Sequence, residues 1–425
     1  MSQREPDNRK SLIVKPSRRI TVPISRDDHE AIIDDAARYR AYLDRLIEQA
    51  PELFPAAIEE GYVWHDVLPE SKKLPGVRLR RLALKTKAGD GKLLVYSITP
   101  SFVLPSMTGF TDEVEKALFL RGFGVPFWAL TYVFGRNDVY WYRLTERLGR
   151  YDIVGTTLKD PARRPEHLLA DEKHTTLHGE TVYLATTVGA ECVLGASLAV
   201  QADTPHLTEA YGHFKAEAQS LCLTYQPQTV NTDGWSPTQQ AWQTLFPLIV
   251  VIQCFLHAFL KIRECAKRLS VFPELQRRVW TVYQAQTPDA FYRQVAELYA
   301  WARQTLTGSV WQAVQKLCAK TGDFIPAFEH PGAYRTSNMI DRQMEPLARY
   351  LYSARYFHGH LMSAEFQVRA WALLHNFQPY CPRALISHAY SSPAHRLNGF
   401  VYHPNWLHNL LISTSCQVVY AHHRK

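Results

Sequence analysis

The stretch from residue 168 to residue 253 constrains the fold most, because its apolar and β-branched residues recur in an order that few architectures satisfy. Three strand-like segments come first, and a helix, a fourth strand, a second helix and a fifth strand follow. In chain order these segments are 168–171, 181–187, 191–199, 208–223, 228–232, 237–245 and 248–253. This order predicts an α/β domain built on a mixed five-stranded sheet.

Acidic residues end two of these expected strands, Asp171 the first and Asp233 the fourth. The order of elements fits an RNase H-like fold, in which the first and fourth strands are neighbours. Carboxylates at neighbouring strand ends supply the hard oxygen ligands that Mg²⁺ prefers, and two such ions can flank a reacting phosphate. An acid at a strand end is also often only a turn residue or a helix cap. Glu172 and His174 follow closely and could orient solvent or pair with Lys173.

The segment that precedes this core is basic in places and suits an anionic partner. A helix is expected over 28–49, and a hairpin with one cationic face over 77–86 and 93–102. Three short helices at 111–121, 126–134 and 138–148, with glycine-containing turns, match a helix-turn-helix plan. Side chains of the third helix and its flanks could reach phosphates and base edges; they are Arg136, Tyr140, Arg143, Arg147 and Arg150. A helical connector with a solvated basic face fits the same pattern.

Charge and cysteine content narrow the class of protein. The 425 residues include 48 Lys and Arg against 40 Asp and Glu, and the excess is concentrated in residues 1–22 and 71–92. Seven cysteines are widely spaced without a Cys-x-x-Cys pair, which argues against a disulfide framework or a zinc ribbon and fits a reducing cytosol. The polar start has no secretory signal, and the longest apolar run, 248–260, is too short to span a bilayer. We therefore expect a cytoplasmic protein with no membrane partner.

Several segments together are similar to one known family. They are 154–159 with 168–175 around Asp171, 233–235 with 241–247 around Asp233, the pair Cys254 and His257, the block 334–342, and the C-terminal segments 392–400 and 405–413. In combination they resemble insertion-sequence transposases with a DDE/DDD catalytic core, in the mutator-like group. Cys254 and His257 are similar to the Cys/Asp-x-x-His element of that group, and residues 334–342 resemble its Thr-x-Asn-x-x-Glu block, with Asp341 in the place of the usual Glu.

The resemblance implies an RNase H-like catalytic core with an all-helical insertion behind a DNA-binding N-terminal region. The expected divisions are 1–105 for a basic region with helix and hairpin, 106–158 for the helix-turn-helix, 160–257 for the first part of the core, 258–333 for the insertion, 334–378 for the last core helices and 379–425 for a tail. It also implies that Asp171, Asp233 and Asp341 are catalytic and hold Mg²⁺, which Mn²⁺ can replace.

The third acid has two rivals on nearby helical residues. Ser337 and Asn338 are natural caps that put Asp341 in the first turns of a helix. Glu345 follows Asp341 at i+4 on the same face, and Glu365 is a further alternative with an arginine at i+4. Cys254 and His257 have a zinc-like spacing without a second pair, so we expect them to support the acids.

The resulting hypothesis is a DNA transposase that binds the terminal inverted repeats of its element, cleaves them and joins the 3′ ends to target DNA. Its partners would be double-stranded DNA and a second copy of the chain, and its place the nucleoid of a prokaryotic cytoplasm. One alternative is an RNase H-like nuclease or resolvase that cuts without strand transfer. Another is a catalytically silent, transposase-derived regulator, which the presence of Asp171 and Asp233 argues against.

Overall fold

The chain forms two compact units, one of which is inserted into the other. The computed structural model describes residues 13–72, 74–89, 91–105, 109–353, 357, 359–385 and 389–421. The inserted unit is Arg164–Phe357, and the other unit combines Met1–Arg163 with His358–Lys425. The basic stretches at 1–22 and 71–92 are described only in part: residues 1–12 of the first, and Lys73 and Asp90 of the second, lie outside the described residues.

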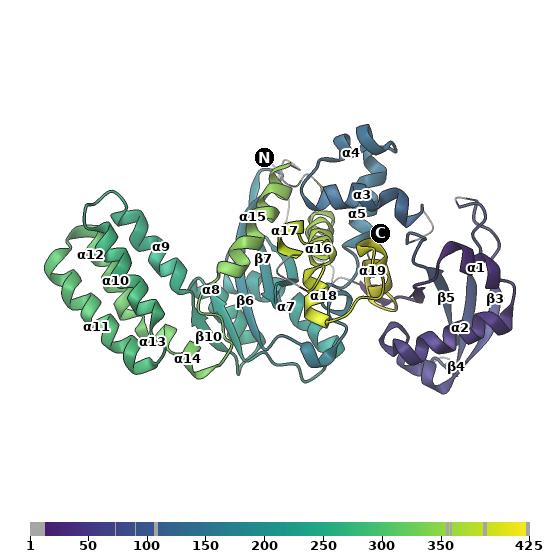
Figure 1. Cartoon of the computed structure of the whole chain (residues 1–425), viewed down its shortest axis with the longest axis horizontal. Coiled ribbons are helices and arrows are strands. Elements are labelled where there is room, and N and C mark those ends of the chain that lie inside the picture. Colours follow the sequence, from purple (N-terminus) through teal and green to yellow (C-terminus); the bar gives the residue numbers. More distant parts are fainter. Residues whose placement is uncertain are drawn as a thin grey trace, which may run out of the picture. The chain divides into compact units, whose positions relative to one another are not determined.

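A five-stranded mixed sheet is the centre of the inserted unit, in the order β10-β9-β6-β7-β8 (Figure 1). Its strands are β6 (His167–Leu177), β7 (Glu180–Gly189), β8 (Cys192–Ala199), β9 (Thr229–Thr232) and β10 (Val250–Gln253). β6, β7 and β8 form an antiparallel meander, whereas β9 is parallel to β6 and β10 is parallel to β9. The predicted mixed five-stranded sheet, with its first and fourth strands as neighbours, is confirmed.

The first strand is longer than expected. β6 does not end at Asp171, because its antiparallel ladder with β7 continues from Asp171↔Thr186 to Leu177↔Glu180. Residues 172–176 of this extension are polar, so the apolar pattern alone does not reveal it. Asp171 therefore lies inside a strand, although beyond the last residue of β6 that pairs with β9, Leu169.

Two helices cover the core side of this sheet. α7 (Thr204–Leu221) packs against β7 and β8, and α8 (Ser236–Leu245) packs against β9, β10 and α7. Trp242 and Phe246 stack with ring centroids 5.7 Å apart and contact Phe214 of α7. This aromatic packing joins α7 to α8 and to Phe246, the residue that follows α8.

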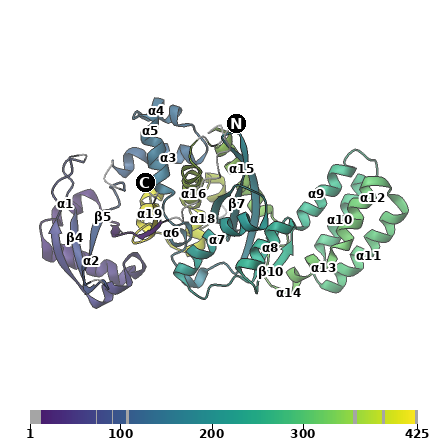
Figure 2. The same cartoon turned by 180° about the vertical axis from the view of Figure 1, so that it is seen from behind.

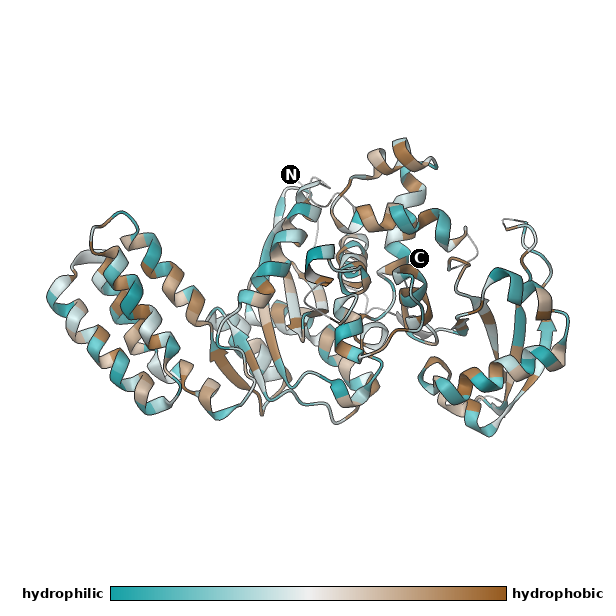
Figure 3. Ribbon diagram, viewed as in Figure 1, coloured by the Kyte–Doolittle hydropathy of each residue, from teal (hydrophilic) through white to brown (hydrophobic). Residues whose placement is uncertain are grey.

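A helical bundle follows β10, as predicted for residues 258–333, and it contains no strand (Figure 2). Its helices are α9 (Phe255–Ala266), α10 (Phe272–Gln284), α11 (Pro288–Thr305), α12 (Gly308–Ala319), α13 (Thr321–Phe324) and α14 (Pro326–Glu329). Figure 3 shows that hydrophobic and hydrophilic residues alternate along these helices, whose apolar faces meet in a separate core. The chain then returns to the sheet and forms α15 (Asn338–Ser353), which packs against β6.

The other unit begins with a small α/β layer. Its four-stranded sheet has the order β2-β5-β4-β3. The strands are β2 (Arg19–Val22), β3 (Tyr62–Val67), β4 (Arg80–Lys87) and β5 (Leu93–Pro100), and the predicted β4–β5 hairpin is confirmed. The single helix expected over 28–49 is wrong: α1 (Arg26–Ile32) and α2 (Ala36–Gln49) are separate, because the Asp35 carboxylate accepts hydrogen bonds from the backbone of Ala37 and Arg38 and starts a new helix. Two 3₁₀ turns, η1 (Pro51–Leu53) and η2 (Ala56–Glu60), follow.

The rest of this unit is helical and draws on both ends of the chain. The predicted trio is confirmed as α3 (Thr111–Gly122), α4 (Phe127–Phe134) and α5 (Asp138–Leu148). The remaining elements are α6 (Ile153–Thr157), η3 (Pro161–Arg163), α16 (Leu361–Phe377), α17 (Pro382–Leu385), α18 (Pro393–Asn398), α19 (Trp406–Ser413), and the antiparallel pair β1 (Ile13–Pro16) and β11 (Val418–Ala421).

Two expected boundaries are therefore wrong. α16 was expected among the last core helices at 334–378, but it packs against α3, α5, α6, α18 and α19 and is buried continuously over residues 364–374. The segment 379–425 is likewise more than a tail, because α19 is buried and β11 pairs with β1. Asn398 accepts hydrogen bonds from the backbone of Lys159 and Asp160, which ties the C-terminal segment to the end of the N-terminal one.

The contact between α5 and α16 depends on a glycine. A Cβ added at Gly149 would lie 1.7 Å from the carbonyl oxygen of Phe366. The backbone of Gly149 has φ −69°, so its conformation is open to any residue and only the close approach excludes a side chain.

We predict that Gly149→Ala destabilises the protein by about 3 kcal/mol, because overpacking forces two helix backbones apart. Thermal unfolding measures the loss. Gly212→Ala is the matched control, since its Cβ would meet Leu245 Cδ2 at an ordinary 3.7 Å. Equal melting temperatures for the two variants would contradict the close α5–α16 packing.

Candidate functional site

Asp171 and Asp233 lie at equivalent positions on adjacent parallel strands. The β6–β9 register pairs His167 with Thr229 and Leu169 with Asn231, and its continuation places Asp171 beside Asp233. Asp233 follows the last residue of β9, and the next residue, Gly234, has φ +88° and would clash with Gln253 if it carried a Cβ. The turn after β9 therefore requires glycine, and this turn sets the direction of the Asp233 side chain.

Asp341 reaches the same region from a helix. It lies in the first turn of α15, as predicted, and its backbone N–H donates to the carbonyl of Ser337 at 3.0 Å. The Ser337 hydroxyl also donates to Asp341 Oδ2, at 3.0 Å. The charge of Asp341 acts on the ionisation of Asp171, so the carboxylates of β6 and α15 are electrostatically coupled.

The environment makes Asp171 hard to ionise. Burial raises its pKa to about 6, and the nearby carboxylates of Asp233 and Asp341 add to this rise. His257 and the hydrogen bond from the Glu172 backbone N–H oppose it. Like charges that are held close together and partly removed from water favour a proton or a cation among them.

A second group of polar side chains joins the two ends of the helical bundle. The Cys254 thiol donates to Ser337 Oγ at 3.2 Å, and the Ser337 backbone N–H donates to Cys254 Sγ at 3.1 Å. His257 Nδ1 lies 3.3 Å from Ser337 Oγ. The residues expected to support the acids, Cys254 and His257, are thus connected to Asp341 through Ser337.

The pKa shifts in this group point to a cationic His257. The neighbouring Cys254 raises the pKa of His257 to about 9 against the opposing effect of burial, and Asp171 and Asp341 contribute to the rise. Burial alone would raise the pKa of the Cys254 thiol, but hydrogen bonds with His257 and Ser337 lower it below its usual value. A positive charge therefore lies beside the carboxylates at neutral pH.

Glu172 belongs to the opposite face of the sheet. Successive strand residues point to opposite faces, and Glu172 Oε1 accepts hydrogen bonds from Tyr211 of α7 at 2.6 Å and Thr238 of α8 at 2.7 Å. Asp171 accordingly faces away from these two helices, toward α15. The sequence suggested pairing with Lys173, whereas among the described residues Glu172 bonds to Tyr211 and Thr238.

The two rivals for the third acid lie elsewhere. The side chain of Glu345 is 75% exposed and pairs with Arg349 at 3.3 Å. Glu365 is on α16, in the other unit, where it is buried; Arg369 is also buried and donates to the carbonyls of Gly149 and Tyr151 rather than standing at the surface. Of the three candidates, the structure brings only Asp341 near Asp171.

The donor chemistry fits a hard divalent cation. Asp171, Asp233 and Asp341 each use one carboxylate oxygen in a hydrogen bond, and the described residues supply no hydrogen bond to the other oxygen. Among the residues that the structure describes, no three His, Cys, Asp or Glu side chains lie close enough to hold one metal ion as they stand. A shared ion would therefore require these carboxylates to rotate toward one another.

The five side chains expected to contact DNA divide into two sets. Arg136, whose side chain is 50% exposed and pairs with Glu113, and Arg143 lie at the surface. The Tyr140 hydroxyl is buried without a hydrogen-bond partner, and Arg147 is half-buried. Arg150 pairs with Glu146 and lies over the ring of Phe366 on α16. The N-terminal half of α5 is thus accessible, whereas its C-terminal half packs against α16.

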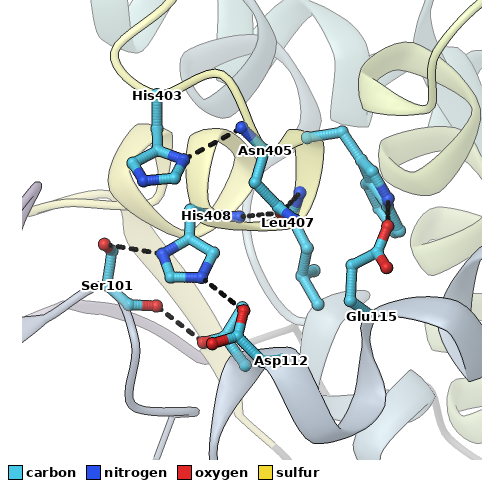
Figure 4. Close-up of polar contacts among 9 residues, drawn as sticks. Ser101, Asp112, Glu115, His403, Asn405, Leu407 and His408 are labelled. Carbon is cyan, nitrogen blue, oxygen red and sulfur yellow. Dashed lines mark hydrogen bonds and ion pairs between the residues drawn. The ribbon is translucent and has the colours of Figure 1, made fainter. Parts of the chain in front are cut away.

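A Ser–His–Asp arrangement in the N- and C-terminal unit is the other chemical candidate. Figure 4 shows His408 between Ser101 and Asp112, with Nδ1 3.0 Å from Ser101 Oγ and Nε2 3.2 Å from Asp112 Oδ1. Ser101 is only 1% exposed, so its hydroxyl cannot reach a substrate. The contacts instead join α19 to α3 and to the end of β5, and no spacing in the sequence signalled them.

Comparison of the chain with protein-family models and with curated proteins found no match. Among the described residues, no helix combines the length and the apolar character that a membrane crossing requires.

The raised pKa of Glu172 makes the stability of the folded protein depend on pH. Burial raises its pKa from 4.5 to about 7, the hydrogen bonds from Tyr211 and Thr238 oppose this, and Asp171 and Asp233 add to it. The folded protein then binds more protons than the unfolded chain in this window, so its stability falls as the pH rises from 4.5 to about 7.

We expect Glu172→Gln to make this fall shallower, because the amide accepts the same hydrogen bonds without titrating. Melting temperatures measured across the window without divalent ions test the expectation. The exposed Glu345→Gln is the control and should keep the wild-type profile. An unchanged profile for Glu172→Gln would show that burial does not perturb this carboxyl.

Proposed function

We propose that this protein is a DNA transposase whose inserted unit is an RNase H-like catalytic core. One observation carries the proposal: Asp171 and Asp233 each lie two residues beyond the last β6–β9 pair, Leu169 and Asn231, and the charge of Asp341 on α15 acts on Asp171. Carboxylates gathered at one sheet edge are suited to the two-metal chemistry of phosphodiester transfer.

The sheet topology supports the RNase H-like part of the proposal. A meander of three antiparallel strands, followed by two strands parallel to the first, has the order expected of that fold. The helical bundle between β10 and α15 has the place that the resemblance assigns to an insertion. The segment after it returns to the sheet, because Asn231 Nδ2 donates to the carbonyl of Tyr334 at 2.9 Å and the Phe255 N–H donates to that of Arg335 at 3.1 Å.

In this proposal Asp171, Asp233 and Asp341 hold Mg²⁺ or Mn²⁺, which when bound would activate the attacking oxygen and stabilise the leaving one. The protein's own contribution is to bring Asp171, Asp233 and Asp341 into one region, where burial and the two other carboxylates raise the pKa of Asp171. Ser337 orients Asp341 by its hydroxyl, and cationic His257 offsets part of the negative charge.

Contact with the element's ends is proposed for the accessible half of α5. The N-terminal residues of a recognition helix are those that approach base edges, and the exposed cations are Arg136, just before α5, and Arg143, in the middle of α5. Tyr140 and Arg150 are left out of the proposed DNA contact, because they face the packed side of the helix. The neighbouring α4 exposes Trp128 and Tyr132, so this surface is aromatic as well as basic.

The first test removes one carboxylate at a time. Asp171→Asn, Asp233→Asn and Asp341→Asn should each abolish the joining of element ends to target DNA with Mg²⁺ or Mn²⁺, because an amide is a poor ligand for hard cations. The ends are the short inverted repeats that we expect beside the gene. Glu345→Gln should keep joining activity, since that side chain faces solvent.

Near-normal joining by any of the three Asn variants would contradict the assignment of these carboxylates to the active site. Cleavage without any joining by the wild-type protein would instead favour a nuclease or resolvase. End binding with neither cleavage nor joining would favour a regulator.

The second test concerns α5. The double variant Arg136→Gln, Arg143→Gln should weaken binding to terminal DNA and lower the slope of log affinity against log salt by about 2, since each lost phosphate contact removes about 0.9. Tyr140→Phe is the matched control, because its hydroxyl is buried and unpaired. The full chain is required, since Asn398 holds the backbone of Lys159 and a fragment ending there would lose this support. Wild-type binding by the double variant would exclude this surface.

A further inference from the structure

α9 begins beside Asp171, Asp233 and Asp341, here called the acid cluster, and exposed cations lie in its C-terminal half and directly after it. We propose that these cations form a track for the phosphate backbone of the DNA that enters the acid cluster. The inference rests on the proposed function and adds a surface that the sequence did not indicate. It concerns the inserted unit alone.

The origin of α9 places it beside the acids. The Cys254 N–H donates to the Thr232 carbonyl at 2.7 Å, so the strand ladder continues up to the first residue of the helix. His257, in the first turn of α9, acts on the charge of Asp171. The helix has 12 residues and therefore leads away from the acids for ~18 Å at 1.5 Å per residue.

The two faces of α9 differ in character. Its buried residues, Phe255, Phe259, Ile262 and Ala266, face the core of the helical bundle. Four exposed cations lie outside this buried stripe: Lys261 and Arg263 on opposite flanks of the last two turns of α9, and Lys267 and Arg268 in the turn that follows Ala266. Glu264 is the single acid between residues 261 and 268. The same helix therefore anchors the bundle on one side and presents positive charge on the other.

These cations have no ion-pair partner among the described residues. By contrast, Arg277 and Arg278 of the adjacent helix α10 both pair with Glu274, at 2.7 Å. Cations that a protein uses only to solubilise a helix are commonly interspersed with acids, as on α10. The charge on α9 is left available for an external anion.

The spacing fits a nucleic-acid backbone. Lys261 and Arg263 lie in the last two turns of α9, and Lys267 and Arg268 follow the helix directly. A DNA strand advances about 3.4 Å per phosphate, so basic side chains this close in the chain can contact neighbouring phosphates. A polyanion with this repeat, bound from the acid cluster outward, is the DNA that the cluster would cut.

The binding test uses the full chain, a duplex DNA of arbitrary sequence and no divalent ion. Lys261→Gln with Arg268→Gln should weaken binding about tenfold or more near ~0.1 M salt and lower the salt slope by about 2. The matched control is Arg293→Gln with Arg303→Gln on α11, which removes the same charge from other exposed positions and should bind as wild type. Thermal unfolding of both variants should match the wild type, because none of the four side chains is buried.

A second measurement does not depend on affinity. Cys265 is an exposed free thiol four residues after Lys261 on α9, and Cys381, also exposed and free, lies in the other unit. Duplex DNA that carries a disulfide tether on one backbone phosphate should form an adduct at Cys265, identified by mass spectrometry of the digested complex. Cys265→Ser should remove that adduct, and Cys381→Ser should leave it.

Three outcomes would overturn the inference. In the first, the α9 variant binds DNA with wild-type affinity and salt slope. In the second, the α9 and α11 variants lose equal DNA affinity. In the third, no adduct forms at Cys265. If the wild-type protein joined DNA ends and any of these held, the α9 track would be wrong and the proposed function would stand. If the wild-type protein bound no DNA, both would fail.

Discussion

Electrostatic repulsion of Asp171 by the carboxylates of Asp233 and Asp341 is the constraint on which the candidate site depends. The parallel register of β6 and β9 brings Asp171 and Asp233 to the same level, and α15 adds Asp341. Charged groups gathered in a partly buried place destabilise a fold unless a proton, a cation or hydrogen bonds compensate them. The raised pKa of Asp171 and the cationic His257 are two of these compensations. A chain that keeps such an arrangement retains a preference for positive charge, which is the physical basis of the proposed metal chemistry.

The helical bundle is connected to these acids through its two ends, Cys254 and Ser337. It leaves the sheet at Cys254 and returns at Ser337, and hydrogen bonds between these two residues close the insertion. Ser337 is also the residue that holds the Asp341 carboxylate. The position of the third acid therefore depends on closure of a segment of about eighty residues, although the bundle has its own apolar core. The same connection starts α9 beside the acids, so the attachment of the insertion also positions the exposed cations of α9.

The second unit depends on one buried helix. α16 contacts helices from both ends of the chain, and the close approach at Gly149 brings it against α5. This packing limits which residues of α5 can meet a ligand. His408 adds a polar link between α19 and α3, where a Ser–His–Asp geometry serves packing because Ser101 is buried. Side-chain identity and spacing alone would not separate such a link from a catalytic triad.

The sequence by itself determined the features that follow from local periodicity. The order of the five strands, the helical bundle, the helix trio and the place of Asp341 in a first turn could all be predicted, because side-chain period and capping act within a few residues. Only the tertiary structure separated Asp341 from Glu345. Both lie on α15, but Asp341 acts on the charge of Asp171, whereas Glu345 is exposed and pairs with Arg349. It also decided that β6 continues past Asp171 by pairing with β7, that α16 and residues 379–421 belong with the N-terminal segments, and that Tyr140 and Arg150 face inward. The physical reason is common to these cases: burial and pairing are set by partners more than a hundred residues away, or on a neighbouring strand, and no local pattern records which partner a segment will meet.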